Sequence, residues 1–338
     1  MRPTTNAVTD MSSAEQRVAT ANALLPAWLQ DAYASFAQMR NENRLPHALI
    51  LNCPVGWGET RLASVIATQL LEVQTSAVAA ELAHPDLHWL RIEEDSLLYK
   101  VAQIREAVGF MQRTAAAGGY KLIIVPDAQR MNEESANTLL KSLEEPPSGG
   151  MWLLLCPDLG QLLATIRSRC QLISIRPGAD TATADFVKEL LREADADERW
   201  VADPPTLAML QFELGGAPER IAQALTLEEE PLWPALSAVR SKPELIGATS
   251  DTWRPRPLAD LLSSWARYAH AVVAQAQPVF MDVPDLNDAA RLKWLDFADE
   301  LTQSRALAAG HAGVNGRLIP DRLLGKWVAL FEQKSTPE

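Results

Sequence analysis

The residues from Cys53 to Thr60 read C-P-V-G-W-G-E-T and have the layout of a phosphate-binding loop. The intact pattern is G-x-x-x-x-G-K-[ST], in which backbone N–H groups surround the phosphates and the lysine contacts the terminal ones. Gly58 and Thr60 match this pattern, and Gly56 lies inside the loop. Cys53 replaces the first glycine, and Glu59 replaces the lysine. The loop therefore keeps the backbone pattern of a nucleotide site but lacks the lysine that contacts the phosphates.

The acid at position 59 changes the charge beside a bound polyanion by two units. One pair of unit charges about 4 Å apart, at an effective dielectric constant near 20, is worth roughly 4 kcal/mol. Repulsion in place of attraction is expected to abolish tight triphosphate binding. We predict that the chain keeps the scaffold of a nucleotide hydrolase and has lost the reaction.

A second part of the same chemistry is expected where the apolar segment 120–125 ends. A hydrolase of this kind places an aspartate there for Mg²⁺ and a glutamate beside it to activate water. Asp127 is present, but Ala128 stands where the glutamate would help. Asp127 also fits an ordinary turn at a strand end, because aspartate is common in turns. The two defects are independent, and both predict a protein that does not hydrolyse nucleotide.

The segments around these residues predict a parallel sheet covered by helices. Several of the apolar segments lack alternation, which is typical of strands buried on both faces. Strands are expected at 48–51, 86–92, 120–125, 151–156 and 171–175, and helices at 28–39, 62–70, 101–111 and 132–145. The last of these helices should end at Pro146-Pro147. We predict an α/β domain of the nucleotide-binding type at residues 1–176.

The remainder of the chain has helical spacing. A small helical domain is expected at 177–232 and a C-terminal helical domain at 233–338, separated by the break at 228–231. Three apolar stripes are predicted to face the core of the C-terminal domain. They consist of Leu258, Leu261, Leu262, Trp265 and Val272; of Leu292, Leu295, Ala298 and Leu301; and of Leu323, Leu324, Trp327, Leu330 and Phe331.

Composition limits the function further. The net charge of −12 argues against a protein whose affinity for DNA depends on broad neutralisation of phosphates by its own surface. The three cysteines are widely spaced and odd in number, which argues against a disulfide framework, and alone they cannot form a four-ligand zinc site. The sequence has no apolar run long enough to span a bilayer and no export signal in its first ten residues. A cytoplasmic protein is the expectation.

Two further motifs carry a resemblance. Residues 136–147 read A-N-T-L-L-K-S-L-E-E-P-P, and residues 165–171 read T-I-R-S-R-C-Q. Together with the altered loop, they resemble the clamp-loader branch of the AAA+ superfamily, and within it the delta-prime subunits of bacterial DNA polymerase III. The likeness is dense at about residues 45–177 and weaker beyond, where it rests on 215–220, 315–318 and 321–324.

The resemblance implies roles for single residues. Arg169 of the S-R-C triplet would act in trans as a catalytic arginine finger in the ATP site of a neighbouring subunit. A guanidinium group suits that task, because it is always charged, planar and rich in donors. The alternative for Arg169 is an ion pair with a carboxylate of its own chain. Gly56, Gly58, Thr60 and Asp127 would form a vestigial nucleotide site that holds no cofactor.

Less specific roles follow for other residues of the motifs. Arg167 is a candidate second positioning charge, and Asn137 is expected near a subunit contact. Arg220 is expected either at such a contact or in a surface salt bridge. Many members of the family carry a zinc module of clustered cysteines, but residues 71–84 contain none. We therefore expect no metal site, with His84 and His88 in structural roles.

The resemblance implies an α/β AAA+-type module, a small helical lid and an all-α collar domain. The chain would be a non-hydrolysing subunit of the clamp loader, which places the sliding clamp on primed DNA during replication. Its partners would be the ATPase and delta subunits in a hetero-pentamer, with no membrane involved. Two alternatives stay open. One is a clamp-loader ATPase subunit with residual nucleotide binding through Thr60 and Asp127, and the other is the delta subunit.

Overall fold

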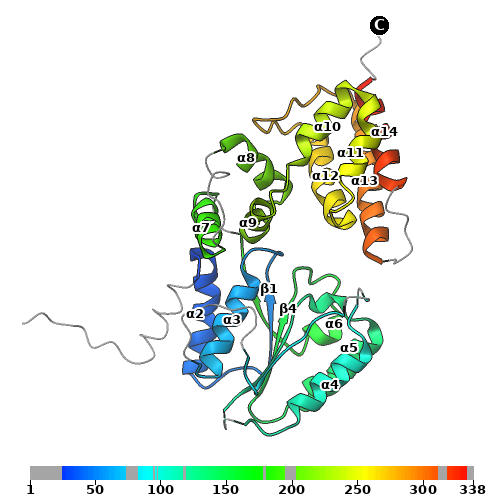
Figure 1. Cartoon of the computed structure of the whole chain (residues 1–338). Coiled ribbons are helices and arrows are strands. Elements are labelled where there is room, and N and C mark those ends of the chain that lie inside the picture. The colour runs from blue at the N-terminus through cyan, green and yellow to red at the C-terminus, as the bar shows by residue number, and fades with distance from the viewer. Residues whose placement is uncertain are drawn as a thin grey trace, which may run out of the picture. The chain divides into compact units, whose positions relative to one another are not determined.

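The computed structural model describes residues 25–73, 83–93, 96, 98–116, 119–177, 180–194, 203–310 and 318–332. The weak motif at 315–318 therefore lies largely outside the described residues. The chain divides into two compact units, Met1–Phe186 and Val187–Glu338 (Figure 1). Each unit is described by itself.

The first unit is built on a parallel sheet of five strands in the order β2-β3-β4-β1-β5. The strands are β1 (Ala48–Asn52), β2 (Leu87–Trp89), β3 (Lys121–Val125), β4 (Gly150–Leu155) and β5 (Gln171–Ser174). All the described pairs are parallel, and β1 lies between β4 and β5. The sheet confirms the predicted α/β fold class, although β2 is shorter than the strand expected at 86–92.

Helices cover both faces of this sheet (Figure 1). Helices α2 (Ala27–Asn41) and α3 (Glu59–Leu70) lie on one side, and α4 (Val101–Met111), α5 (Glu133–Glu144) and the short α6 (Ala164–Arg167) lie on the other. The core on the second side contains Ile50, Ile123 and Trp152 of the sheet against Leu139 and Leu143 of α5. The near-continuous apolar strands are thus explained by burial on both faces.

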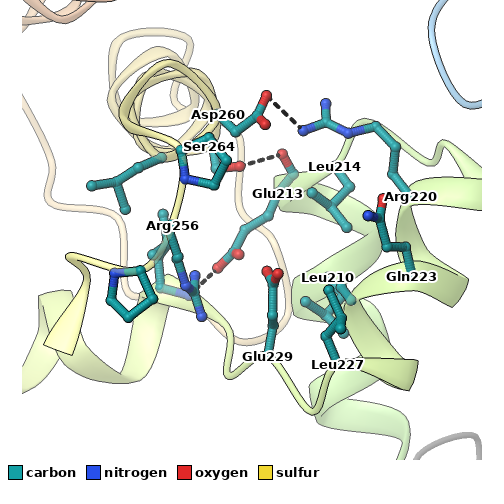
Figure 2. A pocket seen from close by; sticks show the side chains of 15 residues that line it. Leu210, Glu213, Leu214, Arg220, Gln223, Leu227, Glu229, Arg256, Asp260 and Ser264 are labelled. Atoms are coloured by element: carbon teal, nitrogen blue, oxygen red, sulfur yellow. Dashed lines mark hydrogen bonds and ion pairs between the residues drawn. The ribbon is translucent and has the colours of Figure 1, made fainter. Parts of the chain in front are cut away.

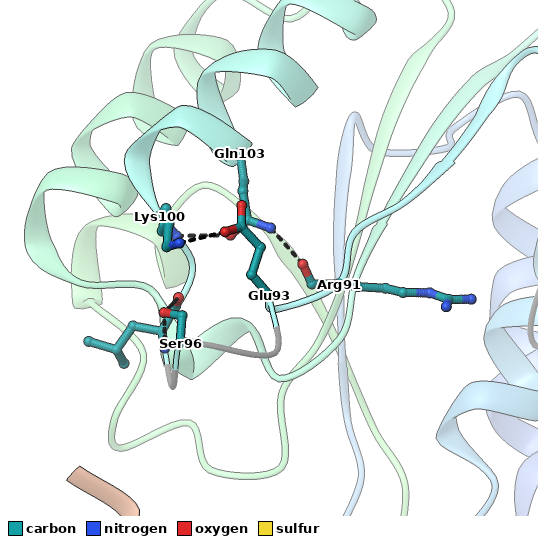
Figure 3. A network of polar contacts seen from close by, with 6 residues as sticks. Arg91, Glu93, Ser96, Lys100 and Gln103 are labelled. Carbon is teal, nitrogen blue, oxygen red and sulfur yellow. Dashed lines mark hydrogen bonds and ion pairs between the residues drawn. The ribbon is translucent and has the colours of Figure 1, made fainter. Parts of the chain in front are cut away.

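A polar network joins the start of α4 to the segment that follows β2 (Figure 3). The Gln103 side chain accepts a hydrogen bond from the Lys100 backbone N–H at 3.0 Å and donates to the Arg91 carbonyl at 2.6 Å. The Lys100 ammonium forms an ion pair with Glu93. The bond to the Lys100 N–H satisfies a backbone group at the helix start that has no partner within the helix, and the other two contacts attach this turn to residues 91–93.

The second unit is helical. Helix α7 (Asp180–Glu193) begins before the boundary between the units, and α8 (Pro204–Glu213) and α9 (Pro218–Thr226) follow it. Then come α10 (Leu232–Ser241), η3 (Pro243–Leu245), α11 (Ile246–Thr252), α12 (Leu258–Val273), α13 (Asp288–Gly310) and α14 (Leu318–Glu332). A small apolar cluster includes Leu191, Leu210 and Ile221, and a larger one is built around Trp265 and Trp327. The division into three domains at residues 176 and 232 stays a prediction.

The predicted apolar stripe on α13 is partly wrong. Leu292 is 62% exposed and Leu295 is 40% exposed, although Ala298 and Leu301 are buried as expected. The buried face is instead Trp294, Phe297, Ala298 and Leu301. Both patterns have helical spacing, and the one with the two aromatic rings removes more apolar surface from water. On α12 and α14 most of the predicted stripe residues are buried, and Leu258, Leu330 and Phe331 are partly buried.

Candidate functional site

The loop between β1 and α3 is closed by its own acidic side chain. Gly56 and Gly58 have φ values of 81° and 90°, in the left-handed region that glycine adopts without strain. Gly58 directly precedes the first turn of α3. The Gly56 N–H lies 3.1 Å from both carboxylate oxygens of Glu59, and the Trp57 N–H lies 3.1 Å from one of them. The Glu59 carboxylate thus accepts hydrogen bonds from the loop's N–H groups.

Such clusters of backbone N–H groups attract anions, and phosphate oxygens are the usual acceptors in loops of this type. Here a carboxylate of the same chain is the acceptor. Burial raises the pKa of Glu59, and the nearby charge of Asp127 raises it further, while the bonds from Gly56 and Trp57 act in the opposite direction. The sequence predicted that Glu59 would repel a phosphate. The structure adds that the Glu59 carboxylate itself accepts the hydrogen bonds that a phosphate would accept.

Aromatic side chains pack around the same loop. Trp28 of α2 donates a hydrogen bond from its indole nitrogen to the Trp57 carbonyl at 2.9 Å. The two indole rings meet edge to face with centroids 5.7 Å apart. Phe186 lies 5.5 Å from the Trp28 ring and 5.2 Å from the Arg61 guanidinium. The backbone of the loop is therefore fixed by packing as well as by hydrogen bonds. Sequence reasoning missed these contacts, which join three separate segments.

Asp127 lies directly after β3, close enough to Glu59 for their charges to interact. Its backbone is left-handed, with φ 45° and ψ 47°, and its carboxylate accepts a hydrogen bond from Gln129 at 3.1 Å. Ala128 is fully buried, and Thr60 is half-buried in the first turn of α3. The structure brings Thr60, Glu59 and Asp127 to one end of the sheet. Both the turn and the vestigial-site interpretations of Asp127 fit this placement.

Arg169 lies in the turn between α6 and β5. Its Nη2 donates to Glu144 Oε1 at 2.7 Å, and its Nη1 donates to the Thr165 carbonyl at 3.0 Å. An ion pair with a local carboxylate, the alternative weighed for Arg169, is therefore present in the single chain. The Arg169 side chain is still 35% exposed. Arg167 donates to the Leu159 carbonyl at 2.9 Å.

The strand register separates Arg169 from the loop of its own chain. Gln171 pairs with Leu49 at one end of the β1–β5 ladder, and Ser174 pairs with Asn52 at the other. Arg169 precedes Gln171, whereas the loop follows Asn52. The ladder alone spans roughly 10 Å at about 3.3 Å per residue. Arg169 and the vestigial loop therefore lie toward opposite ends of the sheet.

The other residues named from the sequence lie on the surface or make ordinary contacts within the chain. Asn137 is exposed on α5. Arg220 forms a salt bridge with Asp260 at 3.1 Å, which is one of its two expected roles. His84 accepts a hydrogen bond from the Asp86 N–H at 3.1 Å, and the His88 ring lies 5.3 Å from Phe110. Within the described ranges, no group of three or more histidine, cysteine or acidic side chains is arranged to hold a metal ion.

A second polar site lies in the helical unit, beside a cavity of about 270 Å³ (Figure 2). Glu213 ends α8, is 3% exposed and accepts hydrogen bonds from the Leu232 N–H and the Tyr268 hydroxyl, both at 2.5 Å. A third contact, from the Trp233 N–H, measures 3.3 Å. Burial raises the pKa of Glu213 to about 7. This carboxylate connects α8 to the start of α10 and to α12.

No candidate for membrane insertion appears in the described parts of the chain, where each helix is too short or too polar to cross a bilayer.

The chain is similar to several known DNA polymerase III subunits. A family model described as DNA polymerase III, delta subunit, matches residues 28–179. The DNA polymerase III subunit delta' of Pseudomonas aeruginosa is 29% identical over 327 residues, covering 88% of this chain and 96% of that protein. The subunit delta' of Escherichia coli is 29% identical over 215 residues, covering 59% and 64%. A solved DNA polymerase III gamma subunit-related protein of Thermotoga maritima is 18% identical, with a TM-score of 0.48, covering 84% of this chain and 94% of that one.

Proposed function

We propose that this chain is a member of the delta-prime family of DNA polymerase III subunits and that it serves in a clamp loader as a subunit that does not hydrolyse ATP. The complex would place the sliding clamp on primed DNA during replication. The chain would be part of the DNA-directed DNA polymerase assembly without catalysing nucleotidyl transfer itself.

The observation that carries the non-hydrolysing role is the contact of Glu59 with the loop. The backbone groups that would bind a phosphate already have an anionic acceptor from the same chain. A nucleotide would have to displace this carboxylate and then face its charge at short range. Ala128 supplies no carboxylate to activate water. These two features support a degenerate ATPase site in which Gly56, Gly58, Thr60 and Asp127 keep only their positions.

The proposed contribution of Arg169 is an arginine finger for a neighbouring subunit. Its place near the start of β5 keeps it away from the loop of its own chain, so a phosphate contact has to involve another chain. Its partial exposure leaves the guanidinium accessible. An arginine supplied in trans stabilises charge that develops on the transferring phosphoryl group.

The C-terminal helical region, residues 233–338, is proposed to form part of a collar with the other loader subunits. The exposed leucines at 292 and 295 support this role, because α13 already buries a full apolar face without them. The partners would be the ATPase and delta subunits of a cytoplasmic hetero-pentamer. The clamp and the primed DNA would be reached through that complex.

The direct test is reconstitution. The full-length chain is mixed with the other loader subunits of the same bacterium, and the complex is isolated by gel filtration and its subunits are counted by native mass spectrometry. Clamp loading on primed DNA should require this chain, while the isolated chain should show neither ATP turnover nor micromolar ATP affinity in the presence of Mg²⁺. Turnover by the isolated chain would favour the ATPase alternative. A chain that stays monomeric beside those subunits would refute the proposal.

A further inference from the structure

The Arg169 guanidinium is held from two sides by its own chain. Nη2 donates to the Glu144 carboxylate at 2.7 Å, whereas Nη1 donates to the Thr165 carbonyl at 3.0 Å and approaches the Ser168 hydroxyl at 3.4 Å. Glu144 is the last residue of α5, and Thr165 lies in α6. Two acceptors on separate helices therefore fix the plane of a side chain that would otherwise rotate freely.

Both helices are anchored in the same core. Leu143 of α5 is 2% exposed and Ile166 of α6 is fully buried, and the two belong to one apolar cluster. The Trp152 indole nitrogen also donates to the Ser142 hydroxyl at 3.2 Å, which attaches the last turn of α5 to β4. The packed interior thus sets the spacing between the two points that hold the guanidinium.

Fold stability does not explain this ion pair well. Glu144 is 51% exposed and Arg169 is 35% exposed, and pairs this open contribute little to stability. Glu144 also stands at the C-terminal end of a helix, where the helix dipole disfavours a carboxylate. The geometric consequence of the pair is the orientation that it gives to Arg169.

We propose that Glu144 is a positioning residue, which orients the Arg169 guanidinium for a phosphate in the neighbouring subunit. This inference rests on the proposed function. A guanidinium group has five N–H donors, and the recorded contacts of Arg169 use three of them. Two donors remain, enough for a bidentate contact with phosphate oxygens. An arginine side chain that is already oriented loses less rotamer freedom when the neighbouring ATP site closes around it.

The experiment uses the reconstituted loader with clamp, primed DNA and ATP. It compares full-length chains that carry Glu144→Ala, Glu144→Gln, Arg169→Ala, or both alanine substitutions. Glu145→Ala is the matched control, because Glu145 is the adjacent carboxylate and the structure assigns it no ion pair within the described ranges. Gel filtration of each complex and thermal unfolding of each isolated chain verify assembly and folding.

The expected result is a lower kcat for Glu144→Ala with an unchanged KM for ATP. The decrease should be about threefold to thirtyfold, within the range of coupling between contacting residues. Glu144→Gln, which keeps an acceptor oxygen, should recover part of the rate, and Glu145→Ala should match the unmodified chain. In the Arg169→Ala background, removal of Glu144 should have no further effect.

Three outcomes would overturn the positioning role. Unchanged turnover in Glu144→Ala would show that Arg169 needs no orientation. Faster turnover would show that the ion pair with Glu144 keeps Arg169 away from the phosphate. An equal loss of turnover with and without Arg169→Ala would show that Glu144 acts independently of Arg169. Each of these can occur while Arg169→Ala still slows the complex. If Arg169→Ala has no effect, the finger role itself is refuted, so failure of the inference and failure of the proposed function are distinguishable.

Discussion

The Glu59 carboxylate lies 3.1 Å from the backbone nitrogen of Gly56, in contact with the groups that a phosphate would use. The acid therefore contributes more than a repulsive charge. It supplies acceptors for the N–H groups of Gly56 and Trp57 in the loop before α3. The Trp57 N–H also donates to the Pro54 carbonyl at 3.3 Å, so the Gly56 N–H depends most on the acid. The loop keeps the conformation of a phosphate site because an internal carboxylate supports it.

Replacement of Glu59 by alanine should open this loop to external anions. We expect Glu59→Ala to lower the free energy of unfolding by about 1–2 kcal/mol, since two backbone donors lose a charged partner. Inorganic phosphate should then raise the melting temperature of Glu59→Ala more than that of the unmodified chain. Thermal unfolding at constant ionic strength, with chloride in place of phosphate, measures the difference. Equal phosphate effects in the two proteins would contradict the internal-ligand explanation.

Restoring the lysine should not restore the reaction. In Glu59→Lys a cation replaces the acid, but Ala128 still provides no carboxylate to position water. We expect phosphate release by the isolated variant to stay at the level of a no-enzyme control. Substantial turnover by this single variant would show that our account of the second defect is wrong.

Arg169 should matter only in the assembled loader. Arg169→Ala should lower DNA-stimulated ATP turnover of the complex by about tenfold or more, because the charge on the transferring phosphoryl group loses a stabilising partner. Arg113→Ala is the control for the loss of a cation, since Arg113 is exposed just after α4 and lies outside the S-R-C triplet. Native mass spectrometry should show intact complexes for both variants. Equal turnover in the two would refute the finger role.

The sequence predicted the sheet well because its strands are apolar on both faces and its helices end at clear signals. The apolar segment 120–125 and the stop at Pro146-Pro147 are local features, so they could be identified from neighbouring residues alone. The substitutions at Cys53, Glu59 and Ala128 were visible for the same reason.

The contacts that give these residues their surroundings join distant parts of the chain. Glu144 and Arg169 are 25 positions apart, and Glu213 and Tyr268 are 55 apart. No local pattern specifies such pairs. On α13 two apolar patterns competed, and the choice depended on aromatic packing with other helices. The contacts of Glu59 could have been predicted more easily than these pairs, because its partners are only two and three residues away in the sequence. An acid in the first turn of a helix often accepts hydrogen bonds from nearby N–H groups.

Glu213 should make stability depend on pH. Its ordinary pKa of 4.5 in the unfolded chain rises to about 7 in the folded protein. Between these values the folded state keeps a proton that the unfolded state has lost. The contribution of Glu213 to the free energy of unfolding is therefore largest below pH 4.5, falls as the pH rises to about 7 and is constant at higher pH. The decrease amounts to about 3 kcal/mol at most.

Urea unfolding of the unmodified chain and of Glu213→Gln, from pH 4.5 to 8, isolates this term. The stability of the unmodified chain relative to Glu213→Gln should decrease across this range, because glutamine has no proton to lose. Glu228→Gln removes an exposed carboxylate and serves as the control for net charge. A constant difference between the unmodified chain and Glu213→Gln would mean that Glu213 does not hold its proton in the folded protein.

The exposed face of α13 should be needed for assembly and not for folding. Leu292 and Leu295 lie one turn apart on the solvent side of a helix whose opposite face is already packed. Exposed apolar residues grouped in this way are typical of protein interfaces.

The double variant Leu292→Asp, Leu295→Asp should therefore keep the far-ultraviolet circular dichroism spectrum of the unmodified chain, and its melting temperature should change by a few degrees at most. The variant should nevertheless fail to elute with the other loader subunits in gel filtration. Val279→Asp, in a fully exposed loop position, controls for the effect of an added acid and should assemble normally. Normal assembly of the double variant would place the collar contact on another helix, since a buried interface does not tolerate two unpaired carboxylates.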